Sequence, residues 1–280
     1  MNERQLLLGH SPDPDDAFMF YGLAAGKVPC AGWRFEHVLQ DIQTLNERAL
    51  RAELHITAIS IHAYPLVARH YALTNCGSSM GDGYGPLVVA RRPARVEDLL
   101  GKTIAVPGEM TTAFLVLNIM LGRGRFQHRV VMFDEILECV AGGQADAGLI
   151  IHEGQLTYSN RHLHKVVDLG QWWGEQTRLP LPLGGNCLRR DLGSGAMEEV
   201  AAILRGSIEY GLAHRREAVE YALQYARDLD RALADRFIGL YVNDWTLDHG
   251  DTGRRAVHEL LRRAADIGMV PDPGPIDFVG

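Results

Sequence analysis

The stretch "TIAVPGEMTTAFLVLNIML", residues 103–121, decides the fold class. It opens with four apolar or β-branched residues, continues through a Pro-Gly turn, and ends in an almost entirely apolar run that starts at two threonines. A short apolar run closed by a turn predicts a buried strand, and Ser or Thr before a long apolar run is typical of a helix N-terminus. The stretch therefore predicts a strand, a tight turn and a helix.

The same alternation continues on both sides of this stretch. We expect further strands over residues 5–9, 33–39, 55–60, 85–92, 128–133 and 147–154. We expect helices over about 16–25, 41–50, 62–70 and 134–143, and a mostly helical chain from Met197 onward. Strands that alternate with helices of about ten residues predict parallel sheets covered on both faces.

The pattern restarts after Arg92 and runs to about Leu188, which predicts an α/β fold of two lobes. We expect residues 1–91 and 189–280 to form the first, larger lobe, with the C-terminal helices folded back on it, and residues 92–188 to form the second. The chain would then cross between the lobes twice. The cleft between two such lobes is the default place for a ligand.

Composition excludes several classes of protein. The 280 residues are 46% hydrophobic and carry a net charge of −7, without the basic stripe that nucleic-acid binding requires. No apolar run approaches the roughly 18 residues of a membrane span, and no export signal opens the chain, so we expect a cytoplasmic protein. The four scattered cysteines argue against a disulfide framework and a thiolate zinc site. The oligomeric state is not predicted.

The familiar catalytic motifs are weak. "GSSMG", residues 77–81, matches the GxSxG motif of α/β hydrolases. This motif requires a helix directly after the serine, but the sequence continues as "GDGYGP", residues 81–86, which cannot begin one. His152 and Glu153 do not extend to a zinc-binding HExxH, and His162 and His164 fall in a predicted loop. We therefore expect no metal and no organic cofactor.

Polar residues stand where predicted strands are followed by helices: Asp15, Asp16, Ser60, Thr111 and Thr112. Hydroxyls and free N–H groups at a helix N-terminus bind anions without a basic side chain. For each residue alone, helix capping is the alternative. Because the carboxyl ends of the strands in such sheets open to one side, the set predicts a site for a small carboxylate.

His152 is the candidate catalytic residue. It ends the predicted strand "AGLIIHEG" and should project near the cleft. A histidine with an ordinary pKa of about 6.5 is mostly neutral near pH 7 and can accept a proton. If the strand pleat persists, Glu153 points the opposite way and cannot orient the ring. The alternative is a strand-end histidine with no catalytic role.

Seven segments together resemble the 1,4-dihydroxy-6-naphthoate synthase (MqnD) family of the futalosine route to menaquinone. They are "SPDPDDAFMFYGL", "LQDIQTLNERAL", "TAIS", "GDGYGPLVVA", "IAVPGEMTTAF", "AGLIIHEGQLTY" and "VVDLGQWWGEQTRLPLPLG", and they span nearly the whole chain in the expected order. The resemblance implies a fold similar to periplasmic solute-binding proteins. It also implies conversion of cyclic dehypoxanthine futalosine into the dihydroxynaphthoate, with release of a three-carbon sugar fragment.

The resemblance assigns roles to individual residues. His152 corresponds to the family's proposed base, and the substrate-binding positions are Asp16, Asn46, Ser60, Thr111 and Thr112. The family's opening reads S-P-C-P-N-D-T-F, whereas this chain has Asp13, Asp15 and Ala17 in place of Cys, Asn and Thr. The extra acids would repel a carboxylate, which puts the orientation and identity of the substrate in question. We expect Asp13 and Asp15 to serve as turn and cap.

Three other interpretations remain open at this point. The chain could be a solute-binding protein, a non-catalytic cytoplasmic binder of a small carboxylate, or chorismate dehydratase of the same pathway. Trp172 and Trp173 could stack on a bicyclic substrate, although core packing is expected for at least one of them.

Overall fold

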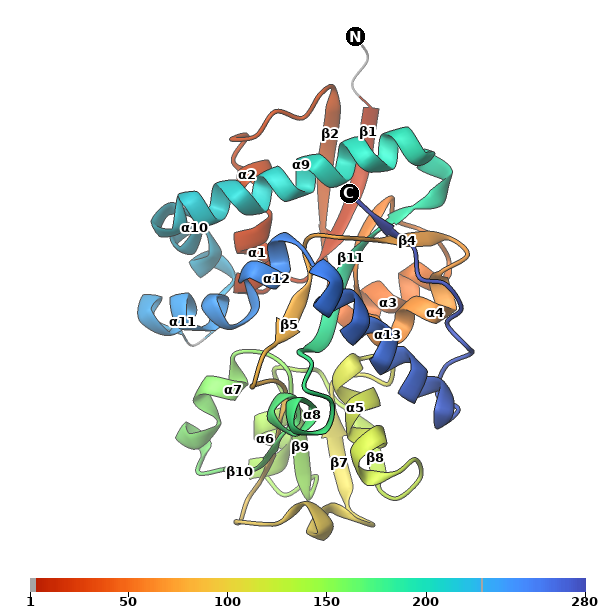
Figure 1. Cartoon of the computed structure of the whole chain (residues 1–280). Coiled ribbons are helices and arrows are strands. Elements are labelled where there is room, and N and C mark those ends of the chain that lie inside the picture. Colours follow the sequence, from red (N-terminus) through yellow and green to blue (C-terminus); the bar gives the residue numbers. More distant parts are fainter. Residues whose placement is uncertain (1–3, 228) are drawn as a thin grey trace.

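The computed structural model describes residues 4–227 and 229–280 and shows two α/β lobes, one above the other (Figure 1). Within these residues the sheet of the first lobe has seven strands, ordered β12-β4-β11-β3-β1-β2 with β5 paired to β11. The sheet of the second lobe has five, ordered β10-β6-β9-β7-β8.

The strands have the following bounds. The first sheet contains β1 (Arg4–His10), β2 (Trp33–Leu39), β3 (Ile56–Ser60), β4 (Tyr71–Thr74), β5 (Ser79–Gly81), β11 (Leu181–Arg189) and β12 (Phe278–Val279). The second contains β6 (Leu87–Ala90), β7 (Thr103–Val106), β8 (Gln127–Val130), β9 (Ala147–Ile150) and β10 (His164–Asp168). Each strand predicted from the apolar pattern is present, whereas β4, β5, β10, β11 and β12 were not predicted.

Both sheets are mixed, so the prediction of parallel sheets is wrong. β11 runs antiparallel to β3, β4 and β5, and β6 runs antiparallel to β9 and β10. β1, β3, β7 and β9 end at the cleft, whereas β6 and β11 enter their sheets from the cleft after a crossing. A strand that enters from the cleft must run against those that end there.

The predicted lobe boundaries need correction. β6 lies in the second sheet, so the first crossing falls between Gly81 and Leu87, before residue 92. β11 lies in the first sheet, so the second crossing falls just before Leu181, ahead of residue 188. The apolar pattern cannot show this shift, because a buried strand has the same composition in either sheet.

Helices cover the sheets as the sequence predicts, with shorter elements at the start. The helix expected over 16–25 begins at Pro14 and divides at Phe20 into α1 (Pro14–Met19) and α2 (Tyr21–Ala24). Asp41 caps the N-terminus of α3 (Ile42–Leu50), because its carboxylate accepts the Thr44 N–H. The expected helix 62–70 is a 3-10 turn, η1 (Ile61–Ala63), followed by α4 (Tyr64–Val67).

The remaining helices divide between the lobes. The second lobe contains η2 (Val96–Leu99), α5 (Thr112–Leu121), α6 (Ile136–Ala141), α7 (Gly154–Thr157), η3 (Tyr158–Arg161) and α8 (Leu169–Thr177). The C-terminal part contains η4 (Arg190–Leu192), α9 (Ser194–Ala213), α10 (Arg215–Ala222), η5 (Leu223–Tyr225), α11 (Arg231–Tyr241), α12 (Asp244–Leu247) and α13 (Gly250–Asp266).

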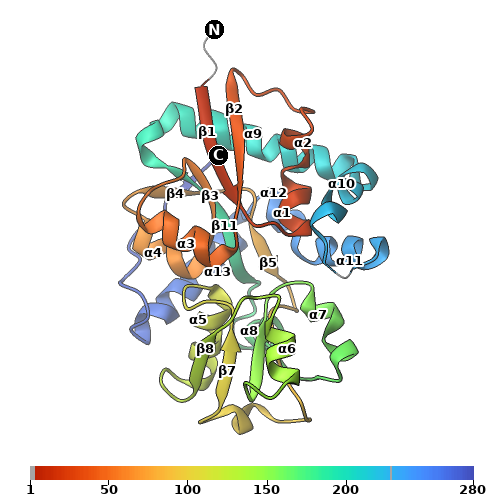
Figure 2. The same ribbon diagram turned by 180° about the vertical axis from the view of Figure 1, so that it is seen from behind.

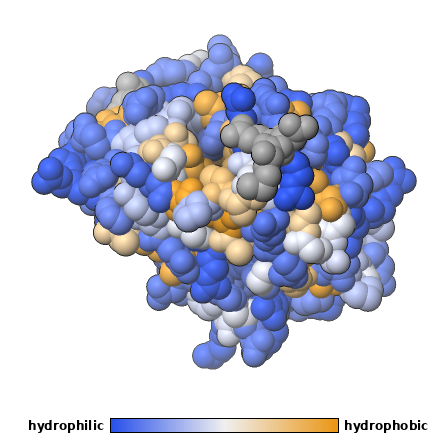
Figure 3. Space-filling view, turned by 90° about the horizontal axis from the view of Figure 1, so that it is seen from above, coloured by the Kyte–Doolittle hydropathy of each residue, from blue (hydrophilic) through white to orange (hydrophobic). Residues whose placement is uncertain are grey.

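The C-terminal helices pack mainly on the first lobe. α9 contacts α2, α10 and α11 contact α1, and α13 packs on β11. Figure 2 shows this arrangement from behind, with α9 and α10 beside β1, β2 and α1. The face seen from above is mostly hydrophilic, with hydrophobic residues gathered near its centre (Figure 3). None of the helices within residues 4–227 and 229–280 is long and apolar enough to cross a membrane.

Glycines allow a close backbone contact at the first crossing. A Cβ atom on Gly170, the second residue of α8, would lie 1.8 Å from the Tyr84 carbonyl oxygen, and one on Gly81 would lie 2.1 Å from the same oxygen. A Cβ on Gly85 would lie 2.8 Å from the Gly170 nitrogen. The "GDGYG" sequence and Gly170 therefore join the crossing segment to the start of α8.

Candidate active site

A pocket lies between the lobes, at the ends of the strands that point toward the cleft. It is open to solvent and, with that open part included, contains about 720 Å³ of empty space. Ser11 follows β1, Ser60 ends β3, Thr111 follows β7 and His152 follows β9, and all four line the pocket. The strand-end reasoning therefore brings Ser60, Thr111 and His152 to one cleft, as expected.

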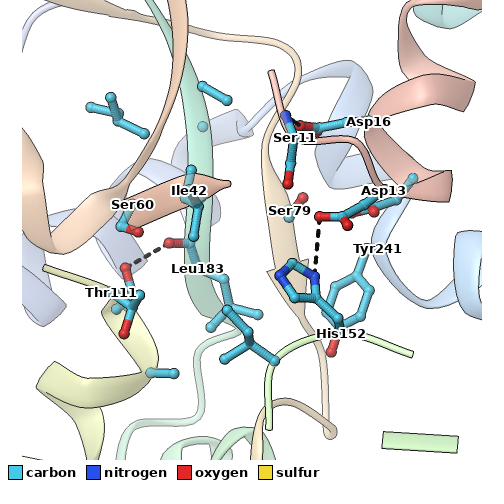
Figure 4. Close-up of a pocket in the computed structure, with 18 of the residues that line it drawn as sticks. Ser11, Asp13, Asp16, Ile42, Ser60, Ser79, Thr111, His152, Leu183 and Tyr241 are labelled. Carbon is cyan, nitrogen blue, oxygen red and sulfur yellow. Dashed lines mark hydrogen bonds and ion pairs between the residues drawn. The ribbon is translucent and has the colours of Figure 1, made fainter. Parts of the chain in front are cut away.

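His152 lies on one wall of this pocket, paired with a carboxylate. Its Nδ1 is 3.1 Å from Oδ2 of Asp13 (Figure 4), and its Nε2 has no partner among the described residues. The ring of Phe133 packs against the imidazole, with 4.2 Å between the centroids. Because an ionised Asp13 accepts the Nδ1 proton, the neutral ring carries its lone pair on Nε2.

Asp13 is the N-terminal flanking residue of α1, but its side chain makes no capping bond in the described structure. Asp13 is only 2% exposed, and its carboxylate faces His152. Its Oδ1 has no hydrogen-bond partner among the described residues. The expectation that Asp13 serves only as a turn or cap residue is therefore wrong. The backbone of Asp13, which precedes Pro14, is extended. Its side chain contacts His152 of the second lobe instead of capping α1.

Asp15 and Asp16 lie in the first turn of α1, and both line the pocket. Asp16 Oδ2 accepts the backbone N–H of Ser11 at 2.6 Å, which fixes the turn between β1 and α1. The placement of Asp16 at the site agrees with the expectation. Asp15 lies in the pocket wall, so its description as merely part of a helix cap needs correction.

Glu153 lies on the same side as His152, contrary to the expectation from a continuing pleat. β9 ends at Ile150, and the chain turns before Glu153. One ligand atom each of Asp13, His152 and Glu153 lie within 4.8 Å of one another. These donor types suit a divalent cation, but the spacing of 3.1 Å between His152 and Asp13 is that of a direct hydrogen bond.

Burial sets the protonation of this acidic wall. It raises the pKa of Asp13 to about 6, and burial together with the Asp13 charge raises that of Asp15 to about 7. The pKa of Asp16 is also raised well above its usual range by burial and by its two acidic neighbours. Burial lowers the pKa of His152. The imidazole therefore stays neutral near pH 7 and can act as a base.

The opposite wall is formed by hydroxyl and backbone groups (Figure 4). Ser60 donates its N–H to Asn46 Oδ1 at 2.8 Å, and its hydroxyl accepts from Asn46 Nδ2 at 3.0 Å. Asn46 is fully buried and is not part of the pocket lining within the described residues. In this arrangement Asn46 acts on the pocket through Ser60, and its direct contact with a substrate stays a prediction.

Thr111 and Thr112 begin α5 on this wall. The Thr111 hydroxyl accepts the Phe114 N–H at 3.2 Å and donates to the Gly108 carbonyl at 2.8 Å, so it is a helix cap. The Thr112 hydroxyl donates to the Leu183 carbonyl at 2.6 Å. The first N–H groups of a helix have no acceptor within it. The backbone of Thr112 and Ala113 therefore offers donors to a ligand in the pocket.

Comparison with known proteins identifies the family. Residues 6–266 match the family model described as menaquinone biosynthesis. The chain is 43% identical to the 1,4-dihydroxy-6-naphthoate synthase of Thermus thermophilus, over 97% of this chain and 98% of the relative. The chain belongs to the 1,4-dihydroxy-6-naphthoate synthase family of menaquinone biosynthesis. The predicted resemblance is thus confirmed, and the protein is an enzyme.

Solved structures confirm the fold of this 1,4-dihydroxy-6-naphthoate synthase family member. An Archaeoglobus fulgidus protein matches with a TM-score of 0.90 and 45% identity, over 95% of this chain and 98% of its own. The alkanesulfonate-binding protein SsuA of Xanthomonas axonopodis matches with a TM-score of 0.71 at 13% identity, over 98% and 96% of the two chains. The predicted periplasmic-binding-protein-like fold is confirmed.

Several residues of this family member's pocket were not predicted. Ser11, Ser79, Asn186 and Tyr241 also line it. Ser11 directly follows β1, so the strand-end signal was available for this residue. Tyr241 belongs to α11, about 90 residues beyond His152 in the chain, and nothing in the local sequence indicates its position.

The paired tryptophans do not line this pocket in the described structure. Trp173 is fully buried, and its Nε1 donates to the Pro180 carbonyl at 3.1 Å. Trp172 packs against the same hydrophobic core. The suggested stacking on a substrate is therefore wrong for this arrangement, and the alternative of core packing describes both residues.

Proposed function

We propose that the enzyme converts cyclic dehypoxanthine futalosine into 1,4-dihydroxy-6-naphthoate, with release of dihydroxyacetone, and that His152 is the general base. The observation that carries this proposal is the free Nε2 of His152 in a pocket whose Asp13 binds the other ring nitrogen. A cytoplasmic location is part of the same proposal.

The reaction requires little of the protein beyond a placed base. Nε2 would remove a proton from the sugar-derived part of the substrate, after which a carbon–carbon bond breaks and the three-carbon fragment leaves. Loss of this fragment makes the remaining ring aromatic, which drives the step. The Asp13 carboxylate stabilises the imidazolium that forms and keeps the ring oriented, as in other carboxylate–histidine pairs.

The two walls of the pocket suggest how the substrate lies. Its carboxylate would be repelled by the ionised Asp13 but accepted by the N–H groups at the start of α5. The hydroxyl groups of the sugar-derived part would face the acidic wall and Nε2 of His152. The acids that depart from the family's opening motif therefore support this orientation, because they face the polyol end.

A His152→Asn substitution tests the proposal. We expect kcat on cyclic dehypoxanthine futalosine to fall at least about a hundredfold, because a placed general base contributes about 10²–10⁴-fold. Folding and product binding should be retained, which thermal unfolding and calorimetry can measure. Near-normal turnover by this variant would contradict the mechanism.

Parallel incubations of the parent enzyme decide the substrate. Cyclic dehypoxanthine futalosine should be consumed and chorismate should not. Consumption of chorismate alone would indicate the dehydratase instead, and binding without turnover of either compound would indicate a non-catalytic binder.

A further inference from the structure

The segment between η5 and α11 of the first lobe contacts the second lobe close to His152. Arg227, in this segment, places its guanidinium carbon 4.6 Å from the centroid of the Phe133 ring. Its backbone N–H donates to Oε1 of the buried Glu153 at 3.4 Å. The residue thus contacts the loop before α6 and the residue that follows His152.

Phe133 connects Arg227 to the imidazole. Its ring packs against His152 with 4.2 Å between the centroids and 65° between the planes. His152 is therefore held by the Asp13 carboxylate at Nδ1 and by an aromatic ring beside it. Phe133 is only partly buried, so a cation over its face restrains a ring that the core does not fully enclose.

A second contact closes the same side of the cleft. The hydroxyl of Tyr241, at the end of α11, donates to Gln155 Oε1 of α7 at 2.8 Å, and both residues are buried. Figures 1 and 2 both show α11 and α7 on one side of the molecule, across the gap between the lobes. Arg227 and Tyr241 therefore both contact the second lobe on this side of the molecule.

We propose that Arg227 is a positioning residue for His152, whose guanidinium holds Phe133 against the imidazole when the lobes are closed. This inference rests on the proposed role of His152 as the base. Arg227 itself does not reach the pocket lining in the described structure, and its side chain is exposed. Its removal should therefore leave the hydrophobic core intact.

The charges around His152 provide a readout that a purely structural role would not change. The groups that act on the imidazole are the acids Asp13, Asp15, Asp134 and Glu153 and the cation Arg227. The acids favour the charged imidazolium, whereas Arg227 opposes it and lowers the pKa of His152. Loss of the Arg227 charge should therefore raise the pKa of His152.

The test compares Arg227→Gln, Arg227→Lys and a control, Arg231→Gln, which removes an exposed arginine at the start of α11. NMR titration of the His152 ring, assigned with the His152→Asn variant, should move to higher pH in Arg227→Gln only. kcat should fall about two- to fivefold in Arg227→Gln, with a smaller change in KM. Lysine should restore the titration, because it restores the charge.

Dependence on Phe133 completes the test. In a Phe133→Leu background, Arg227→Gln should produce little further loss of kcat, because the two residues act as one unit. An unchanged His152 titration in Arg227→Gln, or a loss of kcat that is the same with and without Phe133, would overturn the inference. The titration does not require turnover, so it remains decisive even if His152 proves not to be the base.

Discussion

At the scale of single residues, the pairing of Asp13 with His152 decides what the site can do. The imidazole needs a defined tautomer and a neutral ring, and the structure supplies the first through Asp13 and the second through burial. The position where relatives are expected to carry Cys thus holds a carboxylate in contact with the proposed base. Replacement of Asp13 should affect the reaction more than the fold.

Asp13→Asn should lower kcat at least about tenfold. The amide has no charge to stabilise the imidazolium, and its NH₂ group can bind the wrong tautomer of His152. Stability should be unchanged or increased, because burial raises the pKa of Asp13 to about 6 and thus disfavours its charged form. Steady-state kinetics and thermal unfolding measure the two effects, and an unchanged kcat would show that Asp13 does not orient the base.

At the scale of elements, the first crossing between the lobes depends on backbone contacts that leave no room for a side chain. Gly170, the second residue of α8, lies against the carbonyl of Tyr84, which belongs to the segment where the chain leaves the first lobe. The helix could not start here with a larger residue, because the obstacle is backbone and not a flexible side chain. This contact accounts for Gly81 and Gly85 of "GDGYG", residues 81–85, at the end of β5, which the hydrolase interpretation of "GSSMG" leaves unexplained.

Gly170→Ala should destabilise the protein by about 3 kcal/mol or more, or prevent folding, because the new methyl group would overlap the Tyr84 oxygen. Gly174→Ala, in the same helix, is the matched control, since a Cβ there meets nothing within 4 Å in the described part of the chain. It should be neutral or stabilising by up to about 1 kcal/mol. Equal unfolding midpoints for the two variants would contradict this account.

At the scale of the whole molecule, the site concentrates acids at the contact between the lobes. Burial raises the pKa of Asp15 to about 7, above its ordinary value of 3.8. The folded protein therefore binds this proton more tightly than the unfolded chain. The resulting contribution to stability is fully present below about pH 3.8 and is lost as the pH rises through 7.

Asp15→Asn should consequently raise the stability above pH 7, by up to about 4 kcal/mol, and have a smaller effect near pH 5. Thermal unfolding measured from pH 5 to pH 8.5 gives the difference. The control is Glu220→Gln, which neutralises an exposed carboxylate on α10. If both substitutions change the pH dependence equally, net charge rather than the buried cluster is responsible.

The sequence by itself determined the alternation of strands and helices, because apolar periodicity and capping residues act over a few neighbouring positions. It therefore predicted β1, β3, β7 and β9, and with them Ser60, Thr111 and His152 at the edge of one cleft. The family resemblance followed from the same local segments. These features require no knowledge of which strands pair.

Only the tertiary structure decided the sheet to which β6 and β11 belong, and with it the true crossings between the lobes. It also decided that Asp13 pairs with His152 and that Asn46 supports Ser60 from behind the pocket wall. Contacts such as Arg227 on Phe133 join residues about 90 positions apart. They depend on how two lobes meet, and no local pattern of hydrophobicity or charge records that geometry.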